Sequence, residues 1–462
     1  MRYPLVGASL LLAGCSDGTA PAALPVIEAA SVHANRNNAL SALVAVRAHE
    51  ADSVSVRFHL ATAGAVTDSA TPAVAIENGE ATVPVLGLLP GTAYTARVTA
   101  FGLGGEVQGN ELAFTTDSLP SDLPRYTAGG SAPTPGYVSF GAGRYGLVID
   151  NTGRVVWYRR FEPAGPGLNF QAQPNGRYIS LPPTPDSTDA EVFVEVDHLG
   201  EETRRLGCAG GLRPRFHDLL VEPEGSYWIM CDETRVTDLT AVGGQAAARV
   251  LGTVIQHIGL AGELLFEWSP WDHFSVTDLD STSRTGANVN WTHGNSLAID
   301  AAGNLLVSFR SLSEVTSING TTGAVLWRLG GLRNEFTFLD TPRPAFVRQH
   351  GVRVTTEGLL QLLDNLGDPA ATRVERYQLE PVARTARLVA AHAASPAAHA
   401  QLGGTTQELN DGRVLVAYGN GNRVEEYDRS GAVVWRIEGN PGYVFRAQRI
   451  SSLYTPGVGT PR

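Results

Sequence analysis

The stretch N-W-T-H-G-N-S-L-A-I-D-A-A-G-N-L-L-V-S-F-R, from Asn290 to Arg310, decides the fold of this chain. It predicts two short strands, His293 to Ile299 and Asn304 to Phe309, joined at the turn signal Asp-Ala-Ala-Gly. Because a hairpin returns the chain to its starting edge, His293 and Arg310 are expected to be neighbours. The polar residues that can do chemistry therefore lie at the open end of this hairpin.

A second hairpin follows at once, with strands Glu314 to Ile318 and Ala324 to Leu329. The four strands occupy about 40 residues, which is the length of one blade of a β-propeller. The unit recurs from Tyr126 onward. The first hairpin type has its turns at Gly176, Gly225, Gly303, Gly358 and Gly412. The second type, which often ends in tryptophan, lies around Gly153, Gly200, Gly262, Gly323, Pro381 and Gly431.

These repeats predict a six-bladed β-propeller, because the second hairpin type occurs six times and the first occurs five times. A sixth copy of the first type would form if Tyr443 to Tyr454 paired with the strand near Tyr137 to Phe140. That pairing would close the ring across the two ends of the domain. Counts of five and seven blades remain open.

Composition agrees with an all-β protein. The 462 residues include 51 glycines and 27 prolines, and no apolar period of 3.6 residues persists beyond the N-terminus. With 43% hydrophobic residues the chain can bury a large core and should hold two domains or one very large one. The net charge is −11 and the 35 basic residues are scattered, which argues against a nucleic-acid partner.

A smaller domain is expected in front of the propeller. Residues 21–117 contain alternating runs such as Ala42 to Val46 and Val54 to Phe58, separated by polar or glycine-rich turns, and this spacing predicts a β-sandwich. The run Leu88-Leu-Pro-Gly-Thr-Ala-Tyr94 resembles the tyrosine corner of fibronectin type III domains. Asp117 to Pro124 is the expected boundary, and residues 126–462 form the predicted propeller.

The first 20 residues are interpreted as a lipoprotein signal peptide and tether. Arg2 precedes an apolar run, Leu5 to Ala13, which is too short to span a bilayer. Leu12-Ala-Gly-Cys15 resembles the bacterial lipobox, so Cys15 is the expected lipidation site, and Ser16 favours the outer membrane. The expected location is the periplasm or the cell surface. A plain secretory signal is the alternative.

The two other cysteines, Cys208 and Cys231, would then lie in an oxidising compartment, where a disulfide can persist. They either form a bridge or pack as two small buried hydrophobic side chains. Both alternatives remain open.

Three histidines occupy equivalent positions in the repeat. His217 and His350 each lie eight residues before a turn glycine, and His293 lies ten before. A shift of two residues preserves the face of a strand on which a side chain lies. Innermost propeller strands begin on one face around a central channel, so the three imidazoles should converge there. Arg310 follows its glycine by seven residues, and its counterparts are Asp232 and Asn365.

For any single histidine, capping its blade through a hydrogen bond is the simpler interpretation, but three together with Arg310 favour an anion site. A zinc centre is the sharper alternative, because three imidazoles with an open fourth position can bind a catalytic metal. An adjacent arginine repels a dication, and no carboxylate lies at matching positions to orient the ligands. The sequence therefore predicts a site without metal or cofactor.

From Tyr126 to Tyr454 the chain resembles the bacterial arylsulfate sulfotransferases, six-bladed propellers that move a sulfuryl group between phenols without a nucleotide donor. The resemblance rests on His217-Asp-Leu-Leu, Trp291-Thr-His-Gly-Asn295 with Val307-Ser-Phe-Arg310, Gln349-His350, Leu363-Asp-Asn365 and Gly404-Thr-Thr406. It implies that His350 becomes sulfated, while His217, His293 and Arg310 hold the sulfuryl oxygens. Asn295, Asn365 and Thr405 are the expected substrate-binding residues. Gly351 departs from the bulkier residues expected after the nucleophile, which affects acceptor preference more than chemistry.

The function expected from this resemblance is that of an aryl-sulfate sulfotransferase acting through a sulfohistidine. Its partners would be a small phenolic sulfate donor, a phenol acceptor and a membrane reached through the lipid, with a homodimer as one expected assembly. The alternative is a non-catalytic propeller lipoprotein that binds protein or glycan partners. Convergent imidazoles discriminate between the two, because a docking surface does not need them.

Overall fold

The computed structural model describes residues 22–62, 69–162, 169–182, 192–341, 346–368 and 370–457. In these ranges the chain forms β-strands and a few 3₁₀ turns, and the predicted all-β fold is confirmed. Cys15 and the rest of the predicted signal peptide lie outside the described residues. No helix in the ranges given is long and apolar enough to cross a membrane.

The chain divides into two compact units. The first comprises residues up to His33, Leu43–Val85 and Ala93–Thr115, and the second comprises Ala34–Ala42, Leu86–Thr92 and everything from Thr116 onward. The two segments Ala34–Ala42 and Leu86–Thr92, which lie inside the predicted first domain, therefore cluster with the second unit. The predicted boundaries at residues 117 and 126 remain predictions.

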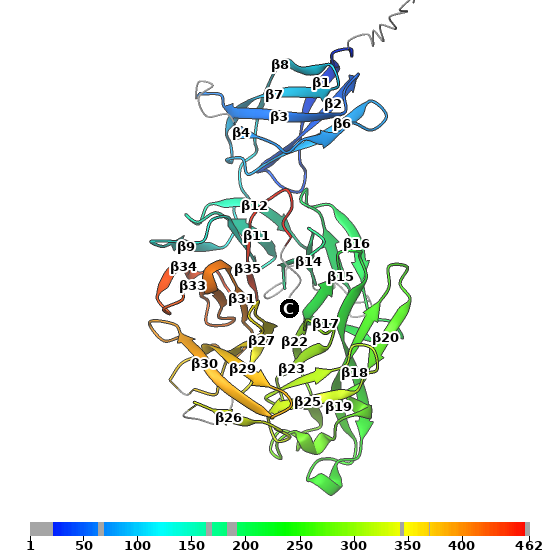
Figure 1. Cartoon of the computed structure of the whole chain (residues 1–462), viewed down its shortest axis with the longest axis vertical. Coiled ribbons are helices and arrows are strands. Elements are labelled where there is room, and N and C mark those ends of the chain that lie inside the picture. Colours follow the sequence, from blue (N-terminus) through cyan, green and yellow to red (C-terminus); the bar gives the residue numbers. More distant parts are fainter. Residues whose placement is uncertain are drawn as a thin grey trace, which may run out of the picture. The chain divides into compact units, whose positions relative to one another are not determined.

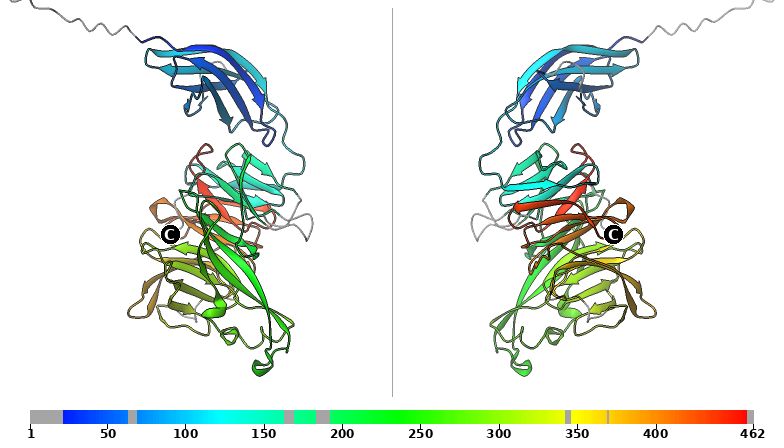
Figure 2. Two further views of the ribbon diagram at one scale, coloured as in Figure 1. Left: turned by 90° about the vertical axis from the view of Figure 1, so that its right-hand side faces the viewer. Right: turned by 90° about the vertical axis from the view of Figure 1, so that its left-hand side faces the viewer.

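The first unit has two sheets, drawn in blue in Figure 2. One has the strand order β1-β2-β6, and the other has the order β4-β3-β7-β8 with β5 paired to β3. Their bounds are β1 (Val26–Ala34), β2 (Ser41–His49), β3 (Ser53–Leu60), β4 (Ser69–Ala70), β5 (Val74–Ala75), β6 (Glu80–Leu86), β7 (Ala93–Gly102) and β8 (Gly105–Thr115). Alternate valines of these strands are buried, for example Val44, Val56 and Val98, as expected for sheets with one covered face. Tyr94 is buried and stacks on Phe114. The fibronectin-like sandwich remains a prediction.

The second unit contains six sheets of four or five strands among the described residues. The chain enters this unit through β9 (Arg125–Gly129), which belongs to the last sheet. The first two sheets use β10 (Tyr137–Ala142), β11 (Tyr145–Ile149), β12 (Val155–Arg160), β13 (Gln171–Ala172), β14 (Tyr178–Ser180), β15 (Phe193–Val196) and β16 (Glu202–Leu206). The third and fourth use β17 (Arg213–Val221), β18 (Tyr227–Thr237), β19 (Ala248–Ile258), β20 (Leu264–Trp268), β21 (Asn288–Asn290), β22 (Gly294–Ile299), β23 (Leu305–Phe309), β24 (Glu314–Ile318) and β25 (Val325–Gly330). The last two use β26 (Thr337–Leu339), β27 (His350–Val354), β28 (Leu360–Asp364), β29 (Arg373–Glu380), β30 (Thr385–Ala393), β31 (Thr405–Glu408), β32 (Val414–Ala417), β33 (Val424–Tyr427) and β34 (Val433–Asn440). The final strand, β35 (Ala447–Ile450), belongs to the first sheet.

The ends of this unit pair as expected. β10 runs antiparallel to β35, with Tyr137 opposite Ile450 and Phe140 opposite Ala447. A second closure was not predicted: β9 adds to the outer edge of the last sheet, where Gly129 lies opposite Arg436. Chain segments far apart in sequence thus complete both sheets.

Hydrogen bonds between the innermost strands of consecutive sheets form a closed cycle. Figure 1 shows β17, β22, β27 and β31 on the inner sides of their sheets. The links run from β13 to β17 (Gln171 to Leu219), β17 to β22 (Arg215 to Gly294), β22 to β27 (Ser296 to Val352), β27 to β31 (Gly351 to Thr406), β31 to β35 (Gln407 to Arg449) and β35 to β13 (Gln448 to Ala172). This cycle gives the sheets a propeller-like order and brings their first strands together.

Tryptophans at the ends of the second hairpins pack between sheets. Trp157 and Trp435 are almost fully buried, and each large ring contributes substantially to the hydrophobic free energy of folding. The indole nitrogen of Trp157 donates to the carbonyl of His198, and that of Trp435 donates to the carbonyl of Asn151, each at 2.8 Å. Each indole therefore ties its own sheet to a turn of the next.

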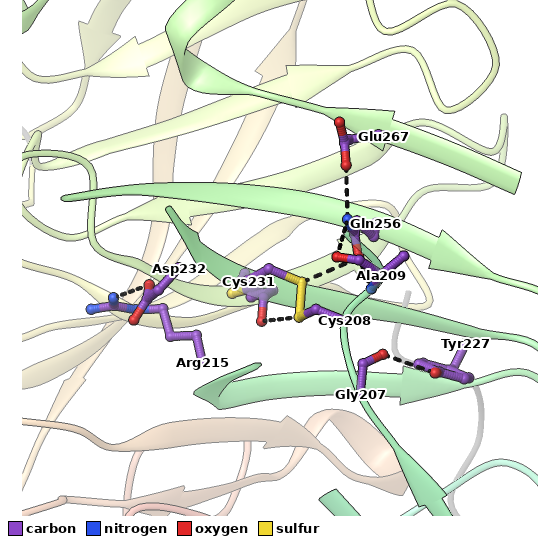
Figure 3. Close-up of a disulfide and its surroundings, with 10 residues drawn as sticks. Gly207, Cys208, Ala209, Arg215, Tyr227, Cys231, Asp232, Gln256 and Glu267 are labelled. Atoms are coloured by element: carbon purple, nitrogen blue, oxygen red, sulfur yellow. Dashed lines mark hydrogen bonds and ion pairs between the residues drawn. A yellow bond between two sulfur atoms is a disulfide. The ribbon is translucent and has the colours of Figure 1, made fainter. Parts of the chain in front are cut away.

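Cys208 and Cys231 form a disulfide, which resolves the alternative left open by the sequence (Figure 3). Cys208 follows β16, the last strand of one sheet, and Cys231 lies in β18, the second strand of the next. The bridge thus links two consecutive sheets. In the antiparallel register Cys231 lies opposite Pro214, next to the segment that carries His217.

Candidate active site

The three aligned histidines meet in the second unit. His217 lies in β17, His293 immediately precedes β22, and His350 begins β27. The ring centroids of His217 and His293 are 5.0 Å apart, and those of His217 and His350 are 6.5 Å apart. The three imidazoles, which lie far apart in the sequence, therefore form one cluster.

A β-bulge lies next to each histidine. The pairing of β17 with β18 jumps from Pro214 to Leu219, so the four residues between them face a shortened partner strand. Similar shifts follow Gly294 in β22 and His350 in β27. A bulge bends its strand and changes the direction of the side chains it carries. The three imidazoles that form the cluster thus all lie at irregular places in their strand pairs.

His293 departs from its predicted place as the first residue of a strand, because it has a left-handed backbone with φ of +52°. Such a conformation costs a non-glycine residue roughly 1 kcal/mol or more. Its neighbours are fixed from both sides: Gly294 donates to the Thr253 hydroxyl at 2.9 Å, and Thr253 donates to the Thr292 hydroxyl at 2.8 Å. The Asn290 amide nitrogen lies 2.7 Å from His293 Nδ1 and orients the ring.

Arg310 lies beside His293, as the hairpin predicts. The amide of Arg310 donates to the carbonyl of His293 at 2.9 Å. Its Nη2 donates to the carbonyl of Gln401 at 3.1 Å, whereas its buried Nε has no hydrogen-bond partner among the described residues. The guanidinium therefore keeps a buried donor for a further acceptor.

His350 is fully buried and contacts Asn365, the residue that follows β28. His350 Nδ1 lies 2.8 Å from Asn365 Oδ1. The Asn365 Nδ2 group donates to the carbonyls of Ala400 at 2.7 Å and Gly403 at 3.0 Å. Asn365 was predicted to bind substrate, and its side chain here contacts the proposed nucleophile.

Asn365, Arg310 and Asp232, which occupy equivalent positions after the turn glycines, each contact a residue of the site or its supports. Asn365 contacts His350, Arg310 lies beside His293, and Asp232 forms an ion pair with Arg215 at 2.5 Å (Figure 3). Arg215 was missed by the sequence analysis. It is 6% exposed and also donates from Nε to the carbonyl of Gly294 at 2.9 Å. Its position two residues before His217, on the same strand, was the available signal.

Burial and neighbouring cations keep the imidazoles neutral. The pKa of His350 is lowered to about 4, chiefly by burial. The hydrogen bonds to Asn365 and to the backbone of Arg348 oppose this shift, whereas the charges of Arg310 and Arg215 add to it. Burial, followed by the charge of Arg215, also holds the pKa values of His217 and His293 well below their usual range. Neutral imidazoles have a free lone pair near pH 7, and the fixed positive charge comes from the arginines.

Three buried polar atoms of the predicted site residues have no hydrogen-bond partner in the described part of the chain. His217 Nδ1, Arg310 Nε and the Thr405 hydroxyl are buried and have no hydrogen-bond partner among the described residues. A buried polar group left unpaired costs about 1–3 kcal/mol. Three of the predicted site residues thus carry a buried donor or acceptor that a polar ligand could satisfy.

Asn295 and Gly351 shape the surroundings of the nucleophile. The Asn295 amide donates to the carbonyl of Gln349 at 2.7 Å, so it holds the residue before His350. Gly351 has φ of +62°, and a Cβ there would lie 2.8 Å from the Cα of Thr405. Only glycine allows β27 and β31 to approach this closely, which explains the departure noted in the sequence.

An aromatic wall borders the histidines. The rings of Phe216 and Phe445 have centroids 5.4 Å apart, and Phe445 lies 5.6 Å from His217 and 6.4 Å from His350. Tyr443 continues the wall 6.3 Å from Phe445, and burial raises its pKa to about 12. A planar aromatic group could stack against these rings. The sequence analysis missed Tyr443 and Phe445, because they belong to no repeated motif.

A buried network of charged residues contacts β17 through Asp218 and the carbonyl of His217. Asp218 accepts from Arg446 at 2.9 Å, from Arg353 at 3.2 Å and from the amide of Leu297 at 3.0 Å. Arg446 also donates to the carbonyl of His217 at 3.2 Å, and burial lowers its pKa to about 10. Two guanidiniums share one carboxylate here, so the interior carries excess positive charge.

No group of three or more His, Cys, Asp or Glu side chains in the described ranges is arranged to hold a metal ion. A cavity along β9 and β34 contains none of the predicted site residues. We assign the site to the histidine cluster, because its groups can carry chemistry and the residues that line this cavity include no histidine.

No curated protein matches the chain. Similar solved structures include a protein of unknown function from Bacteroides caccae (15% identity, 68% of this chain and 98% of that chain, TM-score 0.44). Another is a catalytically inactive virginiamycin B lyase from Staphylococcus aureus with quinupristin (9% identity, 67% and 87%, TM-score 0.36). Likeness at this level says nothing of activity.

The family comparison is more informative. The model of the arylsulfotransferase (ASST) family matches residues 214–440. The matched segment contains His217, His293, Arg310, His350 and Thr405, so it covers the cluster described above, whereas the aromatic residues Tyr443 and Phe445 lie just beyond it. Over these residues, just under half of the chain, the protein is similar to the arylsulfotransferase family, and this match supports a general sulfotransferase function.

Proposed function

We propose that this protein moves a sulfuryl group from a phenolic sulfate ester to another phenol through a sulfohistidine at His350, without a nucleotide donor. The observation that carries the proposal is the set of buried polar atoms without partners around a neutral imidazole: His217 Nδ1, Arg310 Nε and the Thr405 hydroxyl. A sulfuryl group presents three nonbridging oxygens, and its size and charge suit these atoms.

The residue types suit the chemistry. Transfer from a sulfate monoester places charge on the departing phenolate and on the three oxygens. Donors fixed around those oxygens in a dry site stabilise the transition state more than the ground state. The neutral imidazole of His350 is a competent nucleophile, and a covalent intermediate divides the transfer into two easier steps. The wall of Phe216, Tyr443 and Phe445 can receive the aromatic ring of donor and acceptor in turn.

The proposal includes the architecture and the location. The six sheets act as the blades of a six-bladed propeller, with the histidines on or just before the first strands of three consecutive blades. We propose that lipidation at Cys15 anchors the mature chain to the outer membrane, facing the periplasm or the surface. Cys15→Ser should release the protein into the soluble fraction, and a variant that stays with the membranes would contradict the lipid anchor.

Mass spectrometry tests the reaction. The protein is mixed with a nitrophenyl sulfate alone, and the peptide containing His350 should carry a sulfuryl group that added phenol discharges. Turnover should be ping-pong and should need neither nucleotide nor metal, because the donor phenol leaves before the acceptor enters. His350→Ala should abolish both half-reactions. Full activity in that variant, or loss of activity with chelators, would exclude the proposal.

A further inference from the structure

The orientation of the Asn365 side chain determines which nitrogen of His350 carries the proton. The two amide hydrogens of Asn365 are directed at the carbonyls of Ala400 and Gly403, at 2.7 Å and 3.0 Å. Its oxygen must therefore face His350 Nδ1, which lies 2.8 Å away. The reverse orientation would place the amide oxygen against two carbonyl oxygens, all three of them acceptors.

The loop that supplies these carbonyls is itself fixed. Thr372 Oγ1 donates to the carbonyl of Asn365 at 3.2 Å, and the amide of Ala400 donates to Thr372 Oγ1 at 2.8 Å. Asn365, His350 and Thr372 are all almost fully buried. The acceptor facing the imidazole is thus part of a rigid, dry network.

We propose that Asn365 is a positioning residue that holds His350 in the tautomer with its proton on Nδ1, so that Nε2 is the atom that takes the sulfuryl group. An amide oxygen only accepts, and a contact of 2.8 Å in a buried site leaves Nδ1–H as the donor. The second half of this inference rests on the proposed function, whereas the tautomer of the free protein does not.

The tautomer matters in both transfer steps. In the first, the Nε2 lone pair forms the N–S bond while the S–O bond breaks, and the donor phenolate leaves with the electron pair. In the second, the acceptor phenol oxygen forms a bond to sulfur, the N–S bond breaks and its electrons return to Nε2. The acceptor's proton passes to solvent, because the donor phenolate has already left. Nδ1–H stays on the ring throughout, so the ring leaves sulfur as a neutral imidazole.

An amide suits this task better than a carboxylate. Aspartate at position 365 would face the carbonyls of Ala400 and Gly403 with acceptor against acceptor, and it would attract the Nδ1 proton. A ring that lost that proton while sulfated would have to leave as an imidazolide, a much poorer leaving group. Asparagine accepts the hydrogen bond but is not a base at neutral pH, so the intermediate remains reactive toward phenols.

The test is nitrogen NMR of the full chain labelled with ¹⁵N-histidine, in which His350→Gln identifies the signals of His350. In the free protein Nδ1 should have the shift of a protonated ring nitrogen and Nε2 that of an unprotonated one. In Asn365→Leu this preference should be lost. His257 serves as an internal control, because its Nε2 contacts Glu222 in another sheet and should not respond. An Nε2–H tautomer in the wild-type protein would overturn the proposal.

Kinetics and the adduct provide the second measurement. With a nitrophenyl sulfate present, the signal of Nε2 rather than Nδ1 should change. Asn365→Leu should lower the rate of transfer by roughly 10²–10⁴-fold with little change in KM, as expected when a catalytic histidine adopts the wrong tautomer. Asn365→Asp should accumulate an adduct that phenol discharges slowly. An unchanged rate in Asn365→Leu would overturn the positioning role. If no adduct forms although the free protein shows the Nδ1–H tautomer, the proposed function fails and the tautomer assignment stands.

Discussion

The amide of Arg310 donates a hydrogen bond to the carbonyl of His293, at 2.9 Å, across the open end of the β22–β23 hairpin. The pair places a guanidinium with an unpartnered Nε beside an imidazole whose pKa is held low by burial and by the nearby arginines. One hairpin thus supplies both a fixed cation and a neutral ring to the candidate site.

Arg310→Gln should lower turnover of a nitrophenyl sulfate with phenol by roughly 10²–10³-fold, because one fixed donor to the developing charge is removed. Arg310→Lys should recover only part of the rate, since an ammonium lacks the forked geometry. The matched control is Arg205→Gln on β16, whose side chain is mostly exposed and whose rate should be unchanged. Wild-type turnover in Arg310→Gln would remove this residue from the mechanism.

Arg215 and Asp232 should act as one unit. Arg215→Gln removes a buried cation near all three histidines, and we expect a loss of about 10–100-fold in transfer rate. Asp232→Asn should cost less, because the cation remains but is held less firmly. In the Arg215→Gln background, Asp232→Asn should have little further effect. Rates that multiply in the double variant would contradict the coupling.

At low pH, the rate of the reaction should follow the protonation of His350, whose pKa burial lowers to about 4. We expect the rate of donor cleavage to fall only as pH decreases through about 4, whereas an exposed histidine would lose its lone pair near pH 6.5. A loss of rate centred near pH 6.5 in single-turnover measurements would contradict the role of His350 as a neutral nucleophile.

Stability should depend on pH through the same residue. The unfolded chain binds the His350 proton near pH 6.5 and the folded chain only near pH 4. The folded state is therefore disfavoured as pH decreases, by roughly 2 kcal/mol between pH 7 and pH 5 from this group alone. Urea unfolding at both pH values should show a smaller loss in His350→Gln. Equal losses in the two proteins would count against the low pKa.

Asp218→Asn should destabilise the second unit, because Arg353 and Arg446 would lose their shared buried countercharge. Removing one partner of a buried ion pair costs about 3–5 kcal/mol, and the loss should appear as a lower midpoint in urea. Asp238→Asn is the control: that residue is exposed, and its replacement should change stability by less than about 0.5 kcal/mol. Similar midpoints for both variants would show that the network contributes little.

The repeated hairpins were sufficient to predict the elements of the second unit. The turn glycines and the alternation of apolar residues predicted an all-β chain, and the predicted strand Glu314–Ile318 is β24 itself. The missing partner strand predicted the pairing of the two ends, which β10 and β35 confirm. These features are local or repetitive, so the spacing of residues along the chain is enough to predict them.

The same spacing predicted that His217, His293 and His350 converge, since strands at equivalent positions of a repeat begin on one face. It could not predict the bulges beside them, because a bulge depends on the partner strand as well as on its own residues. Nor could it place His293 in the left-handed region, where Thr253 and its neighbours hold it.

Other parts of the site depend on contacts between residues far apart in the chain. Arg215 becomes a site residue only because Asp232 and Gly294 orient its guanidinium. Phe445 and Arg446 reach the histidines because the C-terminal segment returns to the first sheet. Spacing along the chain thus determined which strands and which histidines meet. Tertiary structure alone decided the direction of each side chain, since this depends on hydrogen bonds such as that from Asn365 to Gly403, whose partners no local pattern relates.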